Sequence, residues 1–383
     1  MGTLVTVPLV REVRLRLIFS LLILAHGLIH LMGFVKAFKL AEMSQLTQEI
    51  PRLAGLLWLA CALILTVSGV LFLLRQAPWW WIALPAILLS QALILGSWRD
   101  AKFGTAANLI ILLPVIVAAL DARSDSYDNR YKAAAREGLA RCEDMPLVTE
   151  TDLGHLPDPV QKYLHVTGAV GRPQIHNFRA VFTGDFRNGL KGPWMAFRSE
   201  QFNFLDAPTR VFLMKASMYG LPLVGLHLFR GGSATMQIKM ASLIQVADGM
   251  GPQMNQGETV TLFNDICLMA PAALIDRQRI QWESAGPLAA RAWFTHAGNT
   301  VSALLTFNEA GELVDFISND RFMSSDGKTY TSYPWSTPVG SYRDLDGRRV
   351  AAYGEAIWHT PEGKFSYGKF NLVEIEYNLR EFK

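Results

Sequence analysis

Four long apolar stretches in the first third of the chain most constrain how it can fold. A membrane-spanning helix needs about 20 predominantly apolar residues, because hydrocarbon offers no water to satisfy its backbone. The stretches that qualify are Leu17–Phe38, Leu53–Leu74, Trp79–Trp98 and Phe103–Leu120. The sequence therefore predicts a four-span transmembrane bundle over residues 1–120.

The segments between the spans predict how the bundle is arranged. Arg75–Pro78 and Arg99–Lys102 are very short, so spans two, three and four are expected to pack as antiparallel neighbours. An even number of spans puts both ends of the bundle on one side of the membrane. Lys and Arg are slightly more numerous at those ends than in the loops opposite, so the positive-inside rule favours a cytoplasmic soluble part.

Charge and cysteine content exclude several classes of protein. The net charge is only +3, and no stripe of Lys and Arg is interleaved with aromatic residues, so a nucleic-acid partner is not expected. The three cysteines, Cys61, Cys142 and Cys267, form no CxxC pair. Neither a disulfide framework nor a zinc site is therefore indicated.

The first span contains a pair of histidines, His26 and His30. A spacing of four residues puts both imidazoles on one helix face, which is the geometry of a metal or haem site. Two neutral histidines could instead hydrogen-bond to Ser90, Gln91 or Asn108 on neighbouring spans and stabilise helix packing. Packing is the favoured interpretation, and a metal or haem cofactor is the alternative.

Beyond the spans the sequence predicts a helical connector over residues 121–146 and a soluble, mainly antiparallel β domain over residues 147–383. The apolar residues of the connector are too sparse for a core helix. Short helices are expected at Asp158–Val166 and at Glu258–Ile275, where Pro271 must kink or end the second helix. Alternation of apolar and polar residues predicts about ten strands, with turn residues between them. They lie near Ile175–Arg187, Trp194–Phe204, Arg210–Met218, Leu223–Phe229, Ala234–Met240, Ile280–Glu283, Ala289–His296, Thr300–Phe307, Leu313–Phe322, Val350–His359 and Lys364–Tyr377.

A sheet of this size is expected to curl around a core or a cavity, giving an α+β fold. Two observations favour an apolar cavity: several strands are apolar on both faces, and methionines, whose thioethers suit irregular apolar ligands, gather in this region. The residues predicted to line the cavity are Phe212, Met214, Met218, Leu228, Met236, Met240, Leu262 and Met269.

Four polar residues stand out among apolar neighbours: His227, Asp265, Asp320 and Arg321. A buried charge is tolerated only with a partner, so structural pairing is the favoured role for each of them. The sequence contains no nucleophile elbow, P-loop or HExxH motif, and a catalytic site is not predicted.

The long meander of strands, with an apolar helix near its middle at Gly257–Asp265, resembles the half-barrel of the LolA-like lipoprotein carriers of the bacterial envelope. The whole chain also resembles uncharacterised bacterial membrane proteins with a four-helix front and a His-Gly-Leu-Ile-His-Leu-Met-Gly-Phe segment, here His26–Phe34. The resemblance implies binding of a lipid or a lipid anchor. It also implies a multi-pass protein of the bacterial cytoplasmic (inner) membrane.

The leading functional prediction is a membrane-anchored binding module that holds a lipid or other apolar molecule in the β half-barrel, in envelope lipid or lipoprotein handling. One alternative is a redox or metal/haem protein that uses His26 and His30, with the β domain as a cap. Another is a scaffold that docks a second membrane or envelope protein, which would require an exposed apolar patch.

Overall fold

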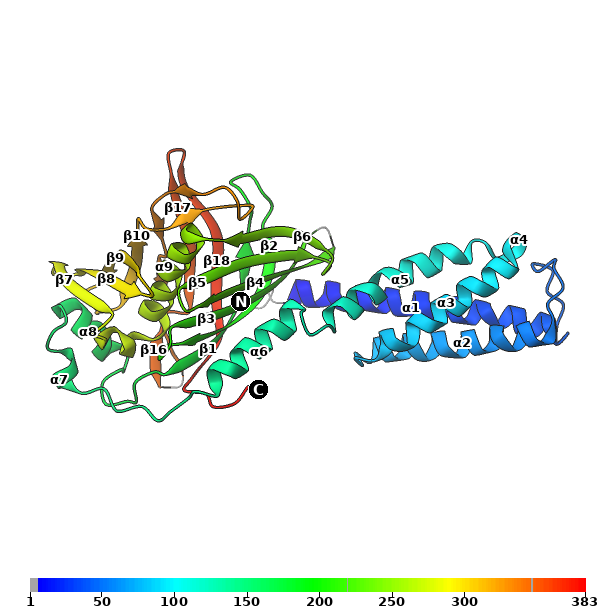
Figure 1. The fold of residues 1–383 in the computed structure, drawn as a ribbon, viewed down its shortest axis with the longest axis horizontal. Helices are drawn as coiled ribbons and strands as arrows, with labels where there is room; N and C mark the ends of the chain where they lie inside the picture. The colour runs from blue at the N-terminus through cyan, green and yellow to red at the C-terminus, as the bar shows by residue number, and fades with distance from the viewer. Residues whose placement is uncertain (1–5, 219, 346) are drawn as a thin grey trace. The chain divides into compact units, whose positions relative to one another are not determined.

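The computed structural model describes residues 6–218, 220–345 and 347–383. The chain divides into two compact units, Met1–Arg123 and Ser124–Lys383 (Figure 1). The first unit is helical, and the second combines a large antiparallel sheet with helices. The predicted α+β fold, with N-terminal helices followed by an antiparallel sheet, is confirmed.

The first unit is built from apolar helices. They are α1 (Thr6–Ala37), α2 (Arg52–Leu73), α3 (Trp79–Gly96), the short α4 (Trp98–Ala101) and α5 (Gly104–Asp121). By length and composition, four segments are able to cross a membrane: Val13–Ala37, Arg52–Leu73, Trp79–Gly96 and Gly104–Asp121. Helix α1 packs on α2. Helix α2 packs on α3 and α3 on α5, as the short links between these spans predict.

Helices α1 and α2 pack closely because small residues, such as Gly33, lie at their contact. A Cβ atom added to Gly33 of α1 would lie only 2.4 Å from the indole ring of Trp58 on α2. The glycine therefore leaves room for the tryptophan, and a larger side chain at this position would push the helices apart.

The second unit contains α6 (Tyr127–Leu139), α7 (Glu150–Leu153), α8 (Asp158–Val166), α9 (Pro252–Met269) and a 3₁₀ turn at Pro271–Ile275. The predicted break at Pro271 is confirmed, since α9 ends two residues before it. The strands are β1 (Asn177–Phe186), β2 (Met195–Phe204), β3 (Thr209–Met218), β4 (Leu221–Arg230), β5 (Ser233–Met240), β6 (Ile244–Met250), β7 (Ile280–Gly286), β8 (Ala289–His296), β9 (Asn299–Phe307), β10 (Leu313–Ser318), β11 (Phe322–Met323), β12 (Thr331–Ser332), β13 (Trp335–Ser336), β14 (Val339–Gly340), β15 (Arg343–Leu345), β16 (Arg348–Val350), β17 (Tyr353–Thr360) and β18 (Gly363–Tyr377).

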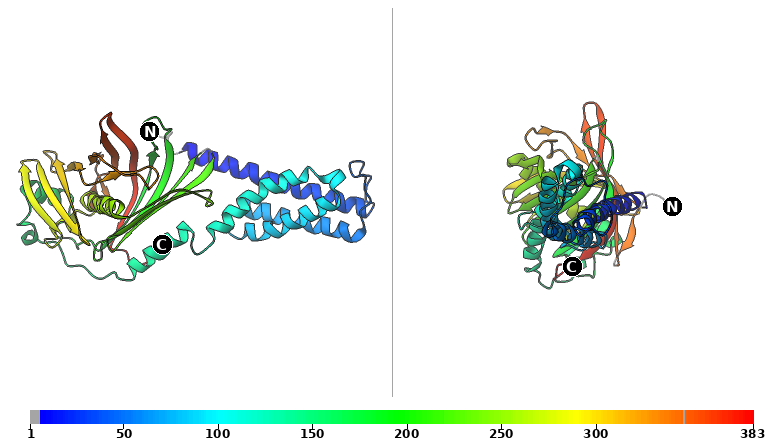
Figure 2. Two further views of the ribbon diagram at one scale, coloured as in Figure 1. Left: turned by 45° about the horizontal axis from the view of Figure 1, so that its top comes forward. Right: turned by 90° about the vertical axis from the view of Figure 1, so that its right-hand side faces the viewer.

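Most of these strands form one open antiparallel sheet in the order β6-β5-β4-β3-β2-β1-β18-β17-β13-β10-β9-β8-β7, with β14 also paired to β17. The sheet curves, and α9 lies in its concavity, in contact with β5 and β6 on one arm and with β9 and β10 on the other (Figure 2). Strands β6 and β7 end the sheet, which does not close into a barrel.

The strand count from sequence, about ten, was too low. The main sheet has 14 strands among the described residues, with further two-stranded pairs at β11–β12 and β15–β16. Strands of two or three residues are too short to show alternation, and they account for much of the difference.

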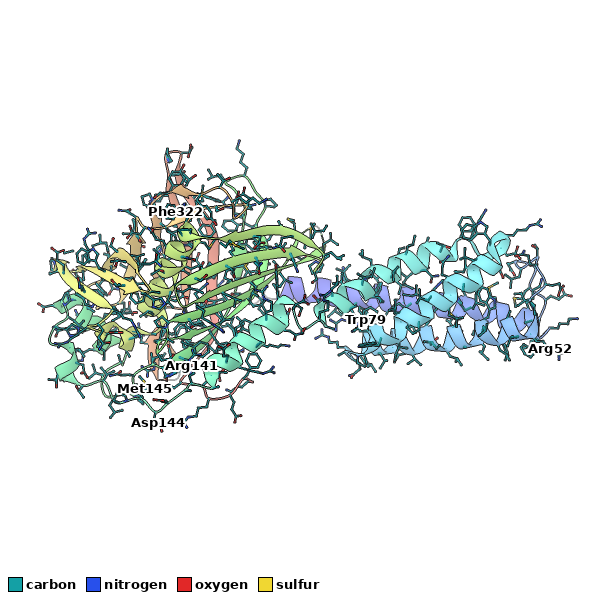
Figure 3. All side chains as sticks on the ribbon, in the orientation of Figure 1. Arg52, Trp79, Arg141, Asp144, Met145 and Phe322 are labelled. Atoms are coloured by element: carbon teal, nitrogen blue, oxygen red, sulfur yellow. The ribbon has the colours of Figure 1, made fainter. Side chains whose placement is uncertain are left out.

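The connector was also misinterpreted, because α6 is a packing helix. Its residues Tyr127, Tyr131, Ala134, Ala135 and Leu139 are buried against the convex face of β2, β3 and β4. The Ser126 hydroxyl caps its start by accepting a hydrogen bond from the Asn129 amide. Figure 3 labels Arg141, Asp144 and Met145 in the segment that follows, where Arg141 pairs with Asp206 at 3.2 Å.

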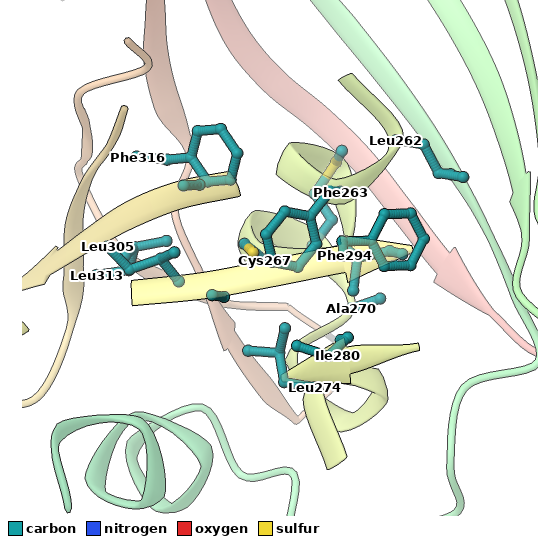
Figure 4. Packing of buried hydrophobic residues seen from close by; sticks show 14 of the residues in the cluster. Leu262, Phe263, Cys267, Ala270, Leu274, Ile280, Phe294, Leu305, Leu313 and Phe316 are labelled. Atoms are coloured by element: carbon teal, nitrogen blue, oxygen red, sulfur yellow. The ribbon is translucent and has the colours of Figure 1, made fainter. Parts of the chain in front are cut away.

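Helix α9 is the centre of the core on the concave face. Phe263 stacks on Phe294 of β8 with 5.1 Å between ring centroids, and it meets Phe316 of β10 edge-on at 5.7 Å (Figure 4). All three rings are fully buried. One half of α9 is thus packed solidly against the arm that contains β7 to β10.

Candidate functional site

An apolar cavity of about 370 Å³ lies on the concave side of the sheet, beside α9. This volume falls at the small end of the range of ligand pockets, about 300–1,000 Å³. Its apolar walls come from β1, β3, β5, β18 and the last turn of α9, and include Phe182, Phe212, Met214, Met236, Leu268 and Phe370. The cavity therefore lies between α9 and the part of the sheet that contains β1 to β6, β17 and β18.

Strand β4 shows why space remains there. Leu223 and His227 line the cavity, and Gly225 lies between them on the same face of the strand. A Cβ atom on Gly225 would meet Ile238 and Met214, two cavity residues, at ordinary contact distances of 3.7 and 3.9 Å. The missing side chain of Gly225 therefore leaves part of the cavity open.

The structure brings most of the sequence-predicted residues to this cavity. Its lining includes Phe212, Met214, Met218, Met236 and Met269, and also the polar residues His227, Asp265 and Arg321.

Four predicted residues lie elsewhere. Leu228 is on the convex face of β4, packed with the cluster under α6, because that face of the sheet is covered as well. Leu262 is fully buried in the core around α9. Met240 ends β5, beyond a register shift between Ile238 and Lys239. Asp320 accepts hydrogen bonds from the Ser302 amide and hydroxyl at 2.6 and 3.0 Å, which fixes a loop after β10.

A buried ion cluster forms one wall of the cavity, with Arg210 of β3 at its centre. Its guanidinium contacts Asp265 at 2.7 Å and Glu258 at 3.2 Å, both on α9. Burial lowers the pKa of Arg210, but the charges of Asp265 and Glu258 outweigh it, so the pKa is raised and the side chain stays charged. The cluster therefore joins α9 to the arm of the sheet that borders the cavity.

Side chains of β2 and β4 complete the cluster. Asp265 Oδ2 accepts further hydrogen bonds from Gln201 at 2.9 Å and from Asn203 at 3.1 Å, both on β2. Glu258 Oε1 lies 3.4 Å from Nδ1 of His227. Because each carboxylate has several partners, the cluster meets the requirement that buried charges be paired and hydrogen-bonded.

Arg210, Glu258, Gln201 and Asn203 were missed by sequence reasoning. A signal existed in each element: Arg210 begins an apolar run in β3, and Glu258 is a charged residue in a helix that is buried on nearly all sides. The partners are too far apart in sequence to be joined, since 55 residues separate Arg210 from Asp265.

The cluster predicts an acid-sensitive fold. Burial raises the pKa of Glu258, but the charge of Arg210 and the contact with His227 outweigh burial and lower the pKa to about 2. A depressed carboxyl pKa stabilises the fold above the ordinary value of 4.5, and this stabilisation is lost as pH falls toward 2. Thermal unfolding between neutral pH and pH 3 should show it, with a smaller pH dependence in Glu258→Gln. An equally steep pH dependence in that variant would contradict the assignment.

The histidine pair of the first unit lies in a buried hydrogen-bond network. His26 Nε2 is 2.9 Å from Asn108 Oδ1 on α5, and His30 Nε2 is 2.9 Å from the Ser90 hydroxyl on α3. His30 Nδ1 lies 2.8 Å from the carbonyl oxygen of His26. Asn108 also donates to Gln91 at 3.0 Å.

The hydrogen bonds settle part of the proton arrangement. A carbonyl oxygen only accepts, so His30 Nδ1 carries a proton, and the Ser90 hydroxyl donates to Asn108 Oδ1 at 3.0 Å. Asn108 donates its amide hydrogen to Gln91, so its Oδ1 accepts from His26. Both nitrogens of His30 therefore have a polar partner within the first unit. Among the described residues no group of three or more His, Cys, Asp or Glu side chains could hold a metal ion.

The solved structures that this chain matches at low sequence identity include the following two proteins. One is a LolA superfamily protein from Nitrosomonas europaea, with 8% identity and a TM-score of 0.33, covering 58% of this chain and 94% of the other. The second is a DUF1329 family protein from Desulfovibrio piger, with 10% identity and a TM-score of 0.33, covering 57% and 91%.

Among curated proteins, none matches this chain. The sequence profile of a family of unknown function, DUF6544, matches residues 146–370. This range begins after α6 and ends within β18, so it takes in the cavity, α9 and the ion cluster. The chain belongs to the DUF6544 family.

Proposed function

We propose that this protein is a membrane-anchored binding module whose β domain holds a lipid or another elongated apolar molecule. The cavity beside α9 is the observation that carries the proposal, because its apolar lining and its volume suit an acyl chain. The four long apolar helices would anchor the chain in a membrane as a multi-pass protein.

The energetics of burial favour such a ligand. Each buried methylene contributes about 0.8 kcal/mol, so about ten methylenes would contribute roughly 8 kcal/mol before the cost of association is subtracted. A cavity lined by flexible methionines accommodates such a chain without needing one fixed shape.

Photo-crosslinking of the full-length chain in lipid nanodiscs would test the proposal. The probe is a hexadecanoate that carries a diazirine in its chain, and labelled peptides are identified by mass spectrometry. We expect label on peptides from β3 to β5 and from α9, in addition to label on the apolar helices. The proposal would be refuted if the label were confined to residues 13–121.

A cavity-filling variant supplies the matched comparison. Gly225→Phe places a ring in the open space next to Met214 and Ile238, and we expect it to reduce label on the β domain by about tenfold. Label on the apolar helices should not change, which provides an internal control. Met250→Phe, at an exposed position on β6 outside the cavity lining, should label like the unaltered protein.

A further inference from the structure

Three arginines line the cavity, and their partners differ. Arg210 is paired with Asp265 and Glu258. Arg187 donates to the backbone carbonyls of Ser366 and Leu190, each at 2.9 Å. Arg321 has neither a carboxylate nor a backbone carbonyl as a partner among the described residues. It forms no ion pair with them, and its Nε makes no hydrogen bond.

Aromatic side chains hold the Arg321 guanidinium in place. Its Cζ atom lies 4.3 Å from the centroid of the Trp335 ring and 5.4 Å from that of Trp358. One terminal nitrogen, Nη1, donates to the Tyr367 hydroxyl at 2.9 Å, and that hydroxyl also accepts from Trp335 Nε1 at 3.2 Å. The cation is thus positioned by rings and by a hydroxyl, and no carboxylate of the described residues lies within ion-pair distance of it.

The acidic side chains that line the cavity, Glu258, Asp265 and Glu355, all have partners already. Glu258 contacts both Arg210 and His227, and Asp265 contacts Arg210, Gln201 and Asn203. On Arg321, the edge formed by Nε and Nη2 makes no hydrogen bond to the described chain. This edge of a guanidinium matches a carboxylate or phosphate bidentately.

From these contacts we propose that Arg321 binds the anionic group of the ligand, so that the ligand is an amphiphile with a carboxylate or phosphate head and an acyl chain. This inference rests on the proposed function, since the acyl chain would occupy the same cavity. The anion would satisfy the unpaired edge of Arg321, and the aromatic rings would keep the guanidinium oriented before the ligand arrives.

Competition for the diazirine-hexadecanoate probe in nanodiscs of zwitterionic lipid tests this inference. The competitors are hexadecanoate, hexadecyl phosphate and hexadecanol, which share one chain and differ in the head, at an alkaline pH that ionises the acid. We expect the anionic competitors to displace the label on peptides of β3 to β5 and α9 at about tenfold lower concentration than the alcohol, because a hydrogen bond between charged groups is stronger than one to a neutral hydroxyl. Whichever anion competes better identifies the head as carboxylate or phosphate.

Variants of Arg321 then assign the preference to this residue. Arg321→Gln should remove the preference for an anion, and Arg321→Lys should retain part of it through its charge. The exposed Arg291 on β8 provides the control, and Arg291→Gln should retain the full preference.

The two proposals fail in different ways. If acid and alcohol displace the label equally from the unaltered protein, or if Arg321→Gln keeps the preference, the role of Arg321 is refuted while cavity binding stands. If no label reaches the cavity at all, the proposed function itself fails. The comparison of acid with alcohol needs no variant, so a folding defect in Arg321→Gln would not prevent the test.

Discussion

Replacing Arg210 by methionine is expected to destabilise the β domain by about 3–5 kcal/mol, because it leaves two buried carboxylates without their counter-ion. Asp265 and Glu258 are both buried on α9, and both depend on this guanidinium. The free energy of opening can be measured from hydrogen exchange of α9 amides in the full-length protein, followed by mass spectrometry. Arg210→Met should accelerate this exchange by more than a hundredfold.

An exposed ion pair on the neighbouring strand is the control for this prediction. Arg230 of β4 pairs with Glu137 at 2.8 Å, and about half of each side chain is exposed. Surface pairs of this kind contribute at most about 1 kcal/mol, so Arg230→Met should change α9 exchange little. If both variants behaved alike, the buried cluster would not be the contact that holds α9 to β3.

Replacing Phe263 by alanine should cost about 3–5 kcal/mol of unfolding free energy in the same measurement. This ring is fully buried between α9 and the arm containing Phe294 and Phe316, so its removal leaves a cavity that the packed neighbours are unable to fill. Val373→Ala, at a position that is 44% exposed on β18, should change the free energy by no more than about 0.5 kcal/mol. A small effect of Phe263→Ala would mean that α9 repacks.

Arg210→Met and Phe263→Ala also distinguish the two sides of α9. Arg210 holds the helix to the arm beside the cavity, whereas Phe263 holds it to the opposite arm. Loss of cavity label in Arg210→Met, with β8 and β9 still protected from exchange, would show that the ion cluster maintains the cavity specifically.

The sequence predicted the parts of this fold that follow from local pattern. The apolar lengths of α2 and α3 identified them as candidate spans, and strict alternation identified β1. The end of α9 followed from Pro271, because proline has no amide hydrogen with which to continue the helix hydrogen bonds. Each of these features depends on residues within one element.

Features that depend on distant contacts were missed or misplaced. Apolar residues on both faces of β4 were taken as evidence for a cavity, but one face packs on α6, so Leu228 was assigned to the wrong side. The α6 stripe itself was visible at Tyr127, Tyr131, Ala135 and Leu139, where spacings of four residues define a single helix face. The packing role of α6 was missed because the alanines on this face have small side chains and make the stripe only weakly hydrophobic.

The position of β18 has a consequence for how the chain folds during synthesis. This strand ends at Tyr377, yet it lies in the middle of the sheet, between β1 and β17. The β1–β6 meander is therefore complete long before its partner emerges from the ribosome, and the edge of β1 stays open until the last strand arrives. An open edge of this kind invites pairing with other chains. We expect the nascent protein to need a chaperone at this stage, and the rate at which the sheet is completed to be set by the synthesis of β18.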